Sequence, residues 1–497
     1  MLGFVRTTHP VTQKHGRLRC EELEPRTLLT IYAPSQILHA YGFDKLPYDG
    51  TGQTIAVVDA YDNPNAASDL TAFDQQFNLP DPAFTIAQPE GQPSADLLWG
   101  LEINLDVQWA HAIAPGASIL LVEAKTSSLG DMMTAVDYAR QQPGVVAVTM
   151  SWGSSEFSLE TRDDSYFTTP SGHIGGSGLP GGVTFVAASG DSGGSVIWPS
   201  SSTNVLSIGG TALTLDDSNN IASETGWSGS GGGPSKFESE PNAQQPFQGY
   251  AMRTTPDFSY NADLYSAYYV VDSYGFNGLV GVYGTSAGSE QWAALIALAD
   301  QALALQKIGS LDGATQTIPA LYNLANTSYA TYYNDIVDGY NGYQAGPGYD
   351  LVTGLGSPIA DQVVQGLING IAPPPGSRAA ASKEELLTQS QPAERTRTAE
   401  SPIQIVHLST PLLSPSRGVE VVAIANPVAG DVPKAAEVST AANWDGKVAV
   451  PLIQPTQVAS ARPAENRLES GGGESGIFAD DLGNDGLDGI ERGEMRI

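Results

Sequence analysis

Residues 54–60 read TIAVVDA, an apolar run rich in β-branched residues that ends in a polar turn. This pattern predicts a strand that is buried on both faces of a sheet. The runs SILLVEA, VVAVTMS and VTFVAAS predict strands of the same kind at 118–124, 145–151 and 183–189. The sequence therefore favours a sheet whose strands are covered on both sides.

Helical patterns separate these strands. Residues 64–78 predict a helix with Pro64 in its first turn. Further helices are predicted over 97–114 and 129–141. Strands that alternate with helices are typical of α/β proteins, so we predict a mostly parallel sheet with helices on both faces.

The compact pattern covers residues 31–372 and then changes. The next segment begins IAPPPGSRAAASKEELL, and its Pro, Ala and charge content predicts a linker. A strand-like piece, VEVVAIA, follows at 419–425. We therefore divide the chain into an N-terminal segment (1–30), a main domain (31–372) and a low-order C-terminal tail or small accessory module (373–497).

The charge of the main domain is strongly acidic. Residues 31–372 hold seven Lys and Arg against 34 Asp and Glu, a net charge of −27. Such a surface repels nucleic acid and anionic membranes, so we expect neither as a partner. It suits a protein that works in acid, although negative charge that serves only solubility would give the same composition.

The N-terminal segment favours export. The stretch RLRCEELEPRTLLT (17–30) resembles a short sorting motif at the start of many exported or surface proteins of certain bacteria. The single cysteine, Cys20, excludes an intrachain disulfide. No stretch approaches the roughly 18 apolar residues of a membrane-spanning helix. We therefore expect an extracellular or cell-surface protein without a membrane span.

A candidate nucleophile lies in residues 281–293, GVYGTSAGSEQWA. Its GTSAG fits the G-x-S-x-G elbow of α/β-hydrolases, which place their histidine after the serine. Here the only later histidine is His407, in the tail. A subtilisin-like layout fits Asp59 at the end of the first strand, but the available His111 lies near a helix C-terminus. Ser286 therefore lacks an obvious histidine partner.

Carboxylates stand where such a base is needed. Glu102 and Asp106 lie four residues apart on one helical face, beside leucines at 98, 101 and 105. A solvated acidic helix face would give the same pattern. Asp191 follows a predicted buried strand in the Gly-flanked turn AASGDSGG, where active-site groups of parallel sheets collect.

These residues belong to five ordered motifs with which residues 32–370 resemble the sedolisins, the serine-carboxyl peptidase family. The motifs are Glu102-x-x-x-Asp106, Ser189-Gly190-Asp191, Trp227-Ser228-x-Ser230-Gly231-Gly232, Gly284-Thr285-Ser286-Ala287 and the loop from Asp335 to Asp350. The resemblance implies a subtilisin-like fold with a glutamate in place of the catalytic histidine. It also implies a monomer that cleaves proteins or peptides.

The resemblance further implies residue roles. Ser286 is the nucleophile, Glu102 accepts its proton, and Asp106 orients Glu102 and shares its charge. Asp191 donates a hydrogen bond to the tetrahedral oxyanion, beside the backbone N–H of Ser286. One structural Ca²⁺ is expected on the side chains of Asp335 and Asp350 and the carbonyls of Ile336, Gly346 and Gly348.

The chemistry of these roles requires acid. A carboxylate is a weak base that works where its pKa matches the medium, and Asp191 donates only while protonated. We therefore predict an endopeptidase with an acidic pH optimum that acts through an acyl-enzyme on Ser286; release of tripeptides from N-termini is a known variant of the family. The alternative, a catalytically silent binding module, predicts a broken set of catalytic residues, and all four are present.

The sequence departs from the family beside the nucleophile. Family members commonly carry glycine three residues before the serine and proline four residues after it. Here these positions are Tyr283 and Glu290. We expect Tyr283 to crowd the approach to Ser286, and Glu290 to add a charge that the helix N-terminus tolerates.

Overall fold

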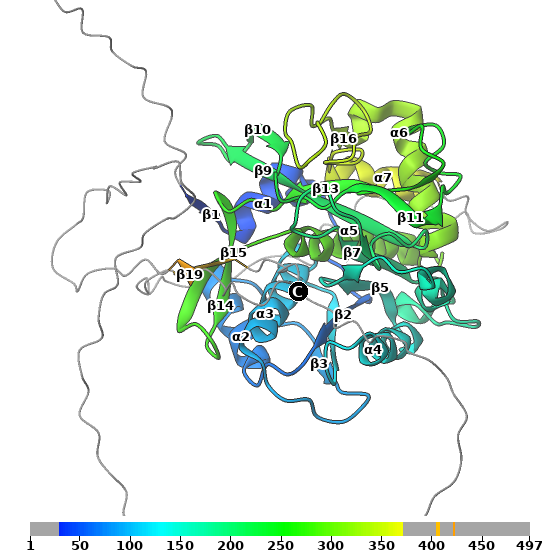
Figure 1. The fold of residues 1–497 in the computed structure, drawn as a ribbon. Coiled ribbons are helices and arrows are strands. Elements are labelled where there is room, and N and C mark those ends of the chain that lie inside the picture. The colour runs from blue at the N-terminus through cyan, green and yellow to red at the C-terminus, as the bar shows by residue number, and fades with distance from the viewer. Residues whose placement is uncertain (1–28, 371–403, 408–420, 423–497) are drawn as a thin grey trace, which may run out of the picture. The chain divides into compact units, whose positions relative to one another are not determined.

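The computed structural model describes residues 29–370, 404–407 and 421–422, all of which belong to one compact unit (Figure 1). Its main sheet has the strand order β10-β9-β7-β5-β2-β4-β3, and β13 pairs with β9. The bounds of these strands are Thr54–Ala60 (β2), Phe84–Ala87 (β3), Ser118–Ala124 (β4), Val145–Met150 (β5), Thr184–Ala188 (β7), Val205–Leu215 (β9), Ile221–Gly226 (β10) and Phe258–Asn261 (β13). Every pairing in this sheet is parallel except that of β10 with β9, which confirms the predicted mostly parallel α/β sheet.

The predicted strands form because their side chains are buried on both faces. Within β2, Ile55 and Val57 join one core cluster, whereas Ala56 and Val58 join the other. Successive side chains of a strand point to opposite faces, so an unbroken apolar run suits this position. The prediction for 54–60 matches β2 residue for residue, and the other three strands agree to within one residue at each end.

Helices cover both faces of the sheet, as predicted. On one face, α3 (Leu97–Ile113) and α5 (Ser286–Leu305) pack against each other and lie side by side in Figure 1. On the other face, α4 (Leu129–Gln141) packs on β2 and β4. Helix α2 (Ala66–Phe77) begins later than predicted: Asn65 is its N-cap, so Pro64 precedes the helix instead of lying in its first turn.

The remaining elements surround this core. They are α1 (Pro34–Tyr41), α6 (Ile318–Tyr332), α7 (Ala360–Gly370), the small pairs β6 (Ser154–Ser155) with β8 (Ile197–Trp198), β11 (Gly233–Ser239) with β12 (Met252–Thr255), and β16 (Tyr333–Asn334) with β17 (Ser357–Pro358). A second sheet has the order β1 (Thr30–Tyr32), β14 (Ser266–Asp272), β15 (Gly278–Tyr283), β18 (Gln404–His407) and β19 (Val421–Val422). Strand β15 leads directly to the start of α5 and so positions the candidate nucleophile.

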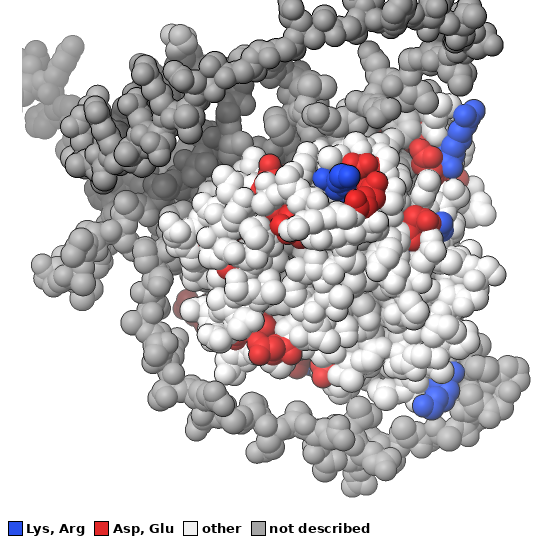
Figure 2. All heavy atoms as spheres, turned by 90° about the horizontal axis from the view of Figure 1, so that it is seen from below, with Lys and Arg blue, Asp and Glu red and all other residues white. Residues whose placement is uncertain are grey.

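Two predictions fall largely outside the described residues. They concern the sorting motif at 17–30, of which only the last two residues are described, and the tail at 373–497, of which only β18 and β19 are described. Within the described ranges, no helix is long and apolar enough to cross a membrane. Figure 2 shows one face of the molecule, on which acidic side chains form several groups and Lys and Arg are few.

Candidate active site

The nucleophile is held at the junction of β15 and α5. Ser286 is the first residue of α5 and is 9% exposed. Just before it, Gly284 has a φ of +143°, and a Cβ at this position would lie 2.5 Å from Oδ2 of Asp191. A side chain at 284 would therefore displace Asp191, so the glycine allows Asp191 to approach the nucleophile turn.

Asp191 is tied to that turn by two hydrogen bonds. The backbone N–H and the hydroxyl of Thr285 donate to its Oδ1 at 2.9 and 2.7 Å. Burial raises the pKa of Asp191 to about 6, although the bonds from Thr285 act to lower it. The carboxyl is therefore protonated in acid, with Oδ2 left to carry the proton, as an oxyanion donor requires.

The loop that contains Trp227 and Ser230 supports the Asp191 turn from behind. The backbone N–H of Gly231 donates to the carbonyl of Gly190 at 2.7 Å. A Cβ on Gly231 would lie 1.9 Å from the carbonyl oxygen of Ser189, so only glycine fits this close approach. The Ser230 hydroxyl donates to the carbonyl of Val352 at 2.7 Å and so links this loop to the segment that directly follows the predicted calcium loop.

The predicted carboxylate pair lies inside the protein. Asp96 caps the N-terminus of α3 by accepting from the N–H groups of Leu98 and Trp99. From Trp99 to Ile113 every residue of α3 is buried, and Glu102 and Asp106 are both 0% exposed. The alternative of a solvated acidic helix face is therefore wrong for this pair.

Burial dominates the electrostatics of the pair. It raises the pKa of Glu102 well above its ordinary value, and the nearby Ser286 side chain acts in the opposite direction. No donor of the described chain lies within normal hydrogen-bonding geometry of either oxygen of Glu102, so this contact with Ser286 is loose. Burial likewise raises the pKa of Asp106, and the charge of Glu290 adds to the effect.

Two further buried carboxyls lie beside the pair. Asp59, at the end of β2, and Glu290, one turn after Ser286 in α5, are both 0% exposed. Burial raises the pKa of each to about 8. The expectation that Glu290 merely adds a charge at the helix N-terminus is therefore wrong, because its carboxyl is in the interior. Helix α5 is buried on almost every face. Its sequence carries apolar residues on every face, and this pattern could have predicted that Glu290 is buried.

Tyr283 is also part of the interior. It is 6% exposed and its ring packs edge-on against Trp227, with centroids 6.2 Å apart. Together with Ala262 and Ala267, these two residues form a small apolar cluster. Tyr283 therefore supports the backbone that leads to Ser286.

The histidines whose side chains are described make their contacts away from Ser286. His111 is buried, with Nε2 2.8 Å from the carbonyl of Pro80 and 3.1 Å from Asp74. His39 contacts Asp44, and His173 contacts the carbonyl of Val145. Near Ser286 the groups that act on Glu102 are carboxyls, so the base available in this part of the chain is a carboxylate.

The predicted calcium loop brings its two aspartates around one tyrosine. Asp335 accepts from the N–H of Gly348 at 3.0 Å, Asp350 accepts from that of Gly346 at 3.0 Å, and both charges act on Tyr329. Within the described chain, the carbonyls proposed as ligands accept no hydrogen bond, so their oxygens remain available for a cation. No cluster of three or more His, Cys, Asp or Glu that could hold a metal occurs among the described residues, and the predicted set contains only two carboxylates. Oxygen donors of this kind fit Ca²⁺.

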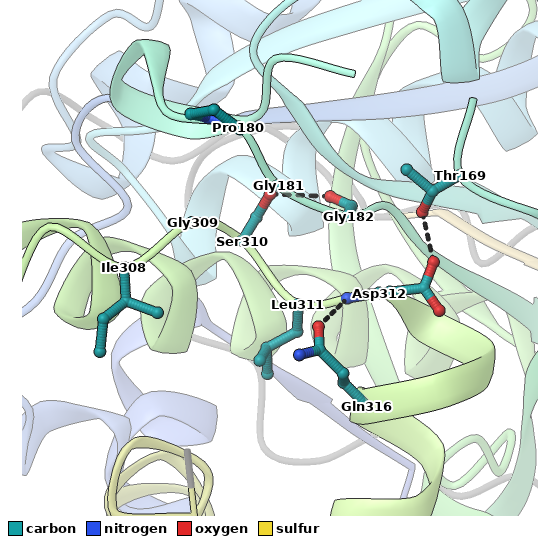
Figure 3. Close-up of a pocket in the computed structure, with 10 residues that line it drawn as sticks. All are labelled: Thr169, Pro180, Gly181, Gly182, Ile308, Gly309, Ser310, Leu311, Asp312 and Gln316. Atoms are coloured by element: carbon teal, nitrogen blue, oxygen red, sulfur yellow. Dashed lines mark hydrogen bonds between the residues drawn. The ribbon is translucent and has the colours of Figure 1, made fainter. Parts of the chain in front are cut away.

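A cavity of about 340 Å³ lies at the other end of α5. It is lined by the segment Pro180–Gly182 and by residues after the end of the helix, among them Ile308 and Asp312 (Figure 3). Thr169 donates to Asp312 at 2.6 Å, and Ser310 donates to the carbonyl of Gly182 at 2.7 Å. Because a helix of 20 residues spans about 30 Å, this cavity is remote from Ser286 and takes no part in its chemistry.

Comparisons with known proteins agree with this site. The Subtilase family model matches residues 100–318, a range that includes the nucleophile and the three carboxyls predicted to act with it. Kumamolisin of Bacillus sp. (strain MN-32) is 32% identical over 407 residues, which cover 73% of this chain and 69% of kumamolisin. Sedolisin of Pseudomonas sp. (strain 101) is 28% identical over 247 residues, which cover 43% of this chain and 39% of that protein.

A solved structure has the same fold. Pseudomonas sedolisin, complexed with two molecules of pseudo-iodotyrostatin, superimposes with a TM-score of 0.60 at 24% identity, over 68% of this chain and 98% of that chain. The fold and the relatives together define a serine peptidase with a subtilisin-like fold. More narrowly, the chain belongs to the sedolisins, the serine-carboxyl peptidase family.

Proposed function

We propose that this peptidase is an acid endopeptidase in which Ser286 forms an acyl-enzyme and Glu102 is the general base. The observation that carries the proposal is the proximity of these two side chains: Ser286, at the start of α5, lies near enough to lower the pKa of Glu102, which is fully buried on the neighbouring α3. The helix N-terminus at Ser286 also favours the negative charge that develops during attack.

The reaction proceeds through two tetrahedral intermediates. Ser286 Oγ attacks the peptide carbonyl while its proton passes to Glu102, and Asp106 holds the pair to one shared negative charge. The protonated Asp191 and the backbone N–H of Ser286 donate to the oxyanion. Glu102 then returns the proton to the leaving amine, and water hydrolyses the acyl-enzyme by the same route in reverse.

The cluster of carboxyls sets the working range. Because like charges at this spacing repel, the cluster carries at most one negative charge in acid, which we propose that Glu102 and Asp106 share. Asp191, whose pKa burial raises to about 6, must keep its proton. Activity is therefore expected below about pH 6 and falls as pH rises through that value.

A pH–rate profile of the purified full chain on a denatured protein substrate tests the proposal, with Ser286→Ala as the control. We expect an acidic optimum and no turnover by Ser286→Ala. An optimum near pH 8, or equal rates for the two proteins, would refute the mechanism. If the only products are tripeptides from the substrate N-terminus, the enzyme is a tripeptide-releasing peptidase and not an endopeptidase.

One structural Ca²⁺ is part of the proposal. Its ligands are the side chains of Asp335 and Asp350 and the carbonyls of Ile336, Gly346 and Gly348. When bound, the ion would hold together a loop that contacts the Ser230 loop through Asn341, whose amide donates to the carbonyl of Ser230 at 2.7 Å. The ion would thereby hold the Ser230 loop in place beside Asp191, and it would take no part in bond cleavage.

Export and a monomeric state complete the proposal. The motif at 17–30 supports an extracellular or cell-surface site. Fractionation of the producing cells tests the location, and recovery in the cytoplasm would contradict it. Light scattering of the purified chain tests the monomer.

A further inference from the structure

Thr285 directly precedes the nucleophile and holds the proposed oxyanion donor, Asp191. It is the N-cap residue of α5 and is 1% exposed. Its carbonyl accepts from the N–H groups of Gly288 and Ser289 at 3.1 and 3.2 Å, so its backbone is part of the helix start that carries Ser286. A group that Thr285 holds is therefore held in a fixed position relative to the nucleophile.

The side chain of Thr285 bridges the backbone and the carboxyl of the Asp191 turn. The N–H of Gly190 donates to its hydroxyl oxygen at 3.1 Å, and the hydroxyl lies 2.7 Å from Oδ1 of Asp191. An amide N–H can only donate, and a hydroxyl has a single proton to give. The proton of the Thr285 hydroxyl therefore goes to Oδ1 of Asp191.

Both donors that the described chain offers to the Asp191 carboxyl reach the same oxygen. The backbone N–H of Thr285 donates to Oδ1 at 2.9 Å, beside the hydroxyl. Because Oδ1 already accepts from two donors, a proton on the carboxyl takes Oδ2. Oδ2 lies beside Gly284, where an added Cβ would be 2.5 Å from it. The hydroxyl thus keeps the proton on the oxygen that lies against the nucleophile turn.

The charge of Asp191 depends on the same hydroxyl. Burial raises the pKa of Asp191 to about 6, and the hydrogen bonds from Thr285 act to lower it. Glu102 on α3 is the ionisable group that interacts with Asp191, and negative charges on the two disfavour each other. The turn 284–285 and the loop 229–231, which pack against the Asp191 turn, carry no charge. Among these neighbours, Thr285 is the group that favours the ionised form.

We propose that Thr285 is a positioning residue of the peptidase reaction, whose hydroxyl fixes the Asp191 carboxyl with its proton on Oδ2. From there Asp191 donates a hydrogen bond to the oxyanion and keeps its proton, while the proton of Ser286 goes to Glu102. The inference rests on the proposed roles of Ser286, Glu102 and Asp191. It goes beyond them because one hydroxyl then sets both the geometry of the donor and the alkaline limit of activity.

Substitutions at 285 separate the hydroxyl from the bulk of the side chain. Thr285→Val keeps nearly the same shape without a donor, whereas Thr285→Ser keeps the donor without the methyl group. We expect kcat of the Val variant to fall roughly tenfold or more at unchanged KM, because the oxyanion exists only after attack. The Ser variant makes the same hydrogen bond, so its kcat should stay within roughly threefold of wild type. Thr285→Ala removes the hydroxyl without placing a methyl group against the N–H of Gly190, and it replaces the Val variant should that protein not fold.

The pH profile gives a measurement that a packing role would not change. Loss of the hydroxyl removes a hydrogen bond to the ionised form of Asp191, so the pKa of Asp191 rises. The alkaline limb of kcat/KM should therefore move up by roughly one pH unit or more in Thr285→Val, although this variant is slower, and stay in place in Thr285→Ser. An unmoved limb or wild-type kcat in the Val variant, or equal losses in the Val and Ser variants, would overturn the inference.

Thr169→Val is the matched control. The Thr169 hydroxyl accepts from the N–H of Val183 at 2.9 Å and donates to Asp312 at 2.6 Å, the same arrangement as at Thr285, beside the remote cavity at the other end of α5 (Figure 3). This substitution should leave kcat and both pH limbs unchanged. A limb that moves equally in Thr169→Val would show that the shift does not come from Asp191 and would also overturn the inference. If wild type itself shows no Ser286-dependent acid activity, the proposed function fails, an outcome distinct from an active enzyme that ignores Thr285.

Discussion

Replacing Asp59 by Asn should stabilise the protein at neutral pH and leave its stability in acid unchanged. Asp59 is 0% exposed, neither of its oxygens has a donor in the described chain, and its register partner on β4 is another acid, Glu123. Burial first, and the charge of Glu123 second, raise the pKa of Asp59 to about 8. The folded protein therefore keeps a proton that the unfolded chain has already lost.

The sign and size of the effect follow from proton linkage. Because the folded state binds more protons between the unfolded pKa of 3.8 and the folded pKa of about 8, the free energy of unfolding falls as pH rises through this range. At pH 7 the difference is about 3 pKa units at about 1.4 kcal/mol each, or about 4 kcal/mol. Asp59 titrates together with Glu123, so we expect about 2–4 kcal/mol.

Urea unfolding at pH 4 and pH 7 measures this difference, in a Ser286→Ala background that prevents self-digestion. Asp59→Asn should unfold at a higher urea concentration than its parent at pH 7 and at the same concentration at pH 4. Exposed Asp217→Asn is the control and should match the parent at both values. Equal stability of Asp59→Asn and its parent at pH 7 would show that Asp59 is not a strained buried acid.

Three further substitutions or treatments test other parts of the site. Gly284→Ala places a Cβ 2.5 Å from Asp191 at a φ of +143° and should lower kcat at least roughly tenfold, whereas Gly249→Ala, whose Cβ meets nothing within 4 Å, should have no effect. A calcium chelator should lower the Tm of Ser286→Ala, and added Ca²⁺ should restore it. At a thousandfold excess over Kd the ion raises the free energy of unfolding by up to about 4 kcal/mol. Asp335→Ala should abolish this response, and a Tm that does not change with chelator would refute the proposed ion. Arg253→Met leaves the buried Asp257 without its partner at 2.5 Å and should cost about 3–5 kcal/mol in urea unfolding, so a wild-type midpoint would contradict the buried pair.

The sequence predicts those features that depend on local patterns. Apolar runs such as 54–60 place the strands, and the spacing of Glu102 and Asp106 places both carboxyls on one side of α3. The turns before Asp191 and Ser286 are marked by glycines whose small size the structure requires. These signals lie within a few residues of the feature that they predict.

Other features depend on contacts between distant segments. The interior position of Glu290 results from α5 packing between α3 and the sheet, and its hydroxyl partners come from residues about 140 positions earlier. The pairing of Asp59 with Glu123 depends on the register of β2 with β4. Neither local spacing nor composition predicts such neighbours. The sequence alone therefore predicts Glu102, Asp106 and Asp191 at the site, and misses the two further buried carboxyls.

The loss of activity above acid pH then has two separable causes. Ionisation of Asp191 near its pKa of about 6 removes the oxyanion donor, whereas ionisation of Asp59 and Glu290, both with a pKa of about 8, places like charges in the interior and weakens the fold. Because the first cause acts at lower pH, the protein should become inactive before it unfolds. Asp59→Asn should therefore remain folded at a pH where it no longer cleaves peptides, and returning it to acid should restore activity at once. Activity that returns only on the timescale of refolding would mean that unfolding, and not the loss of the Asp191 proton, is the first event.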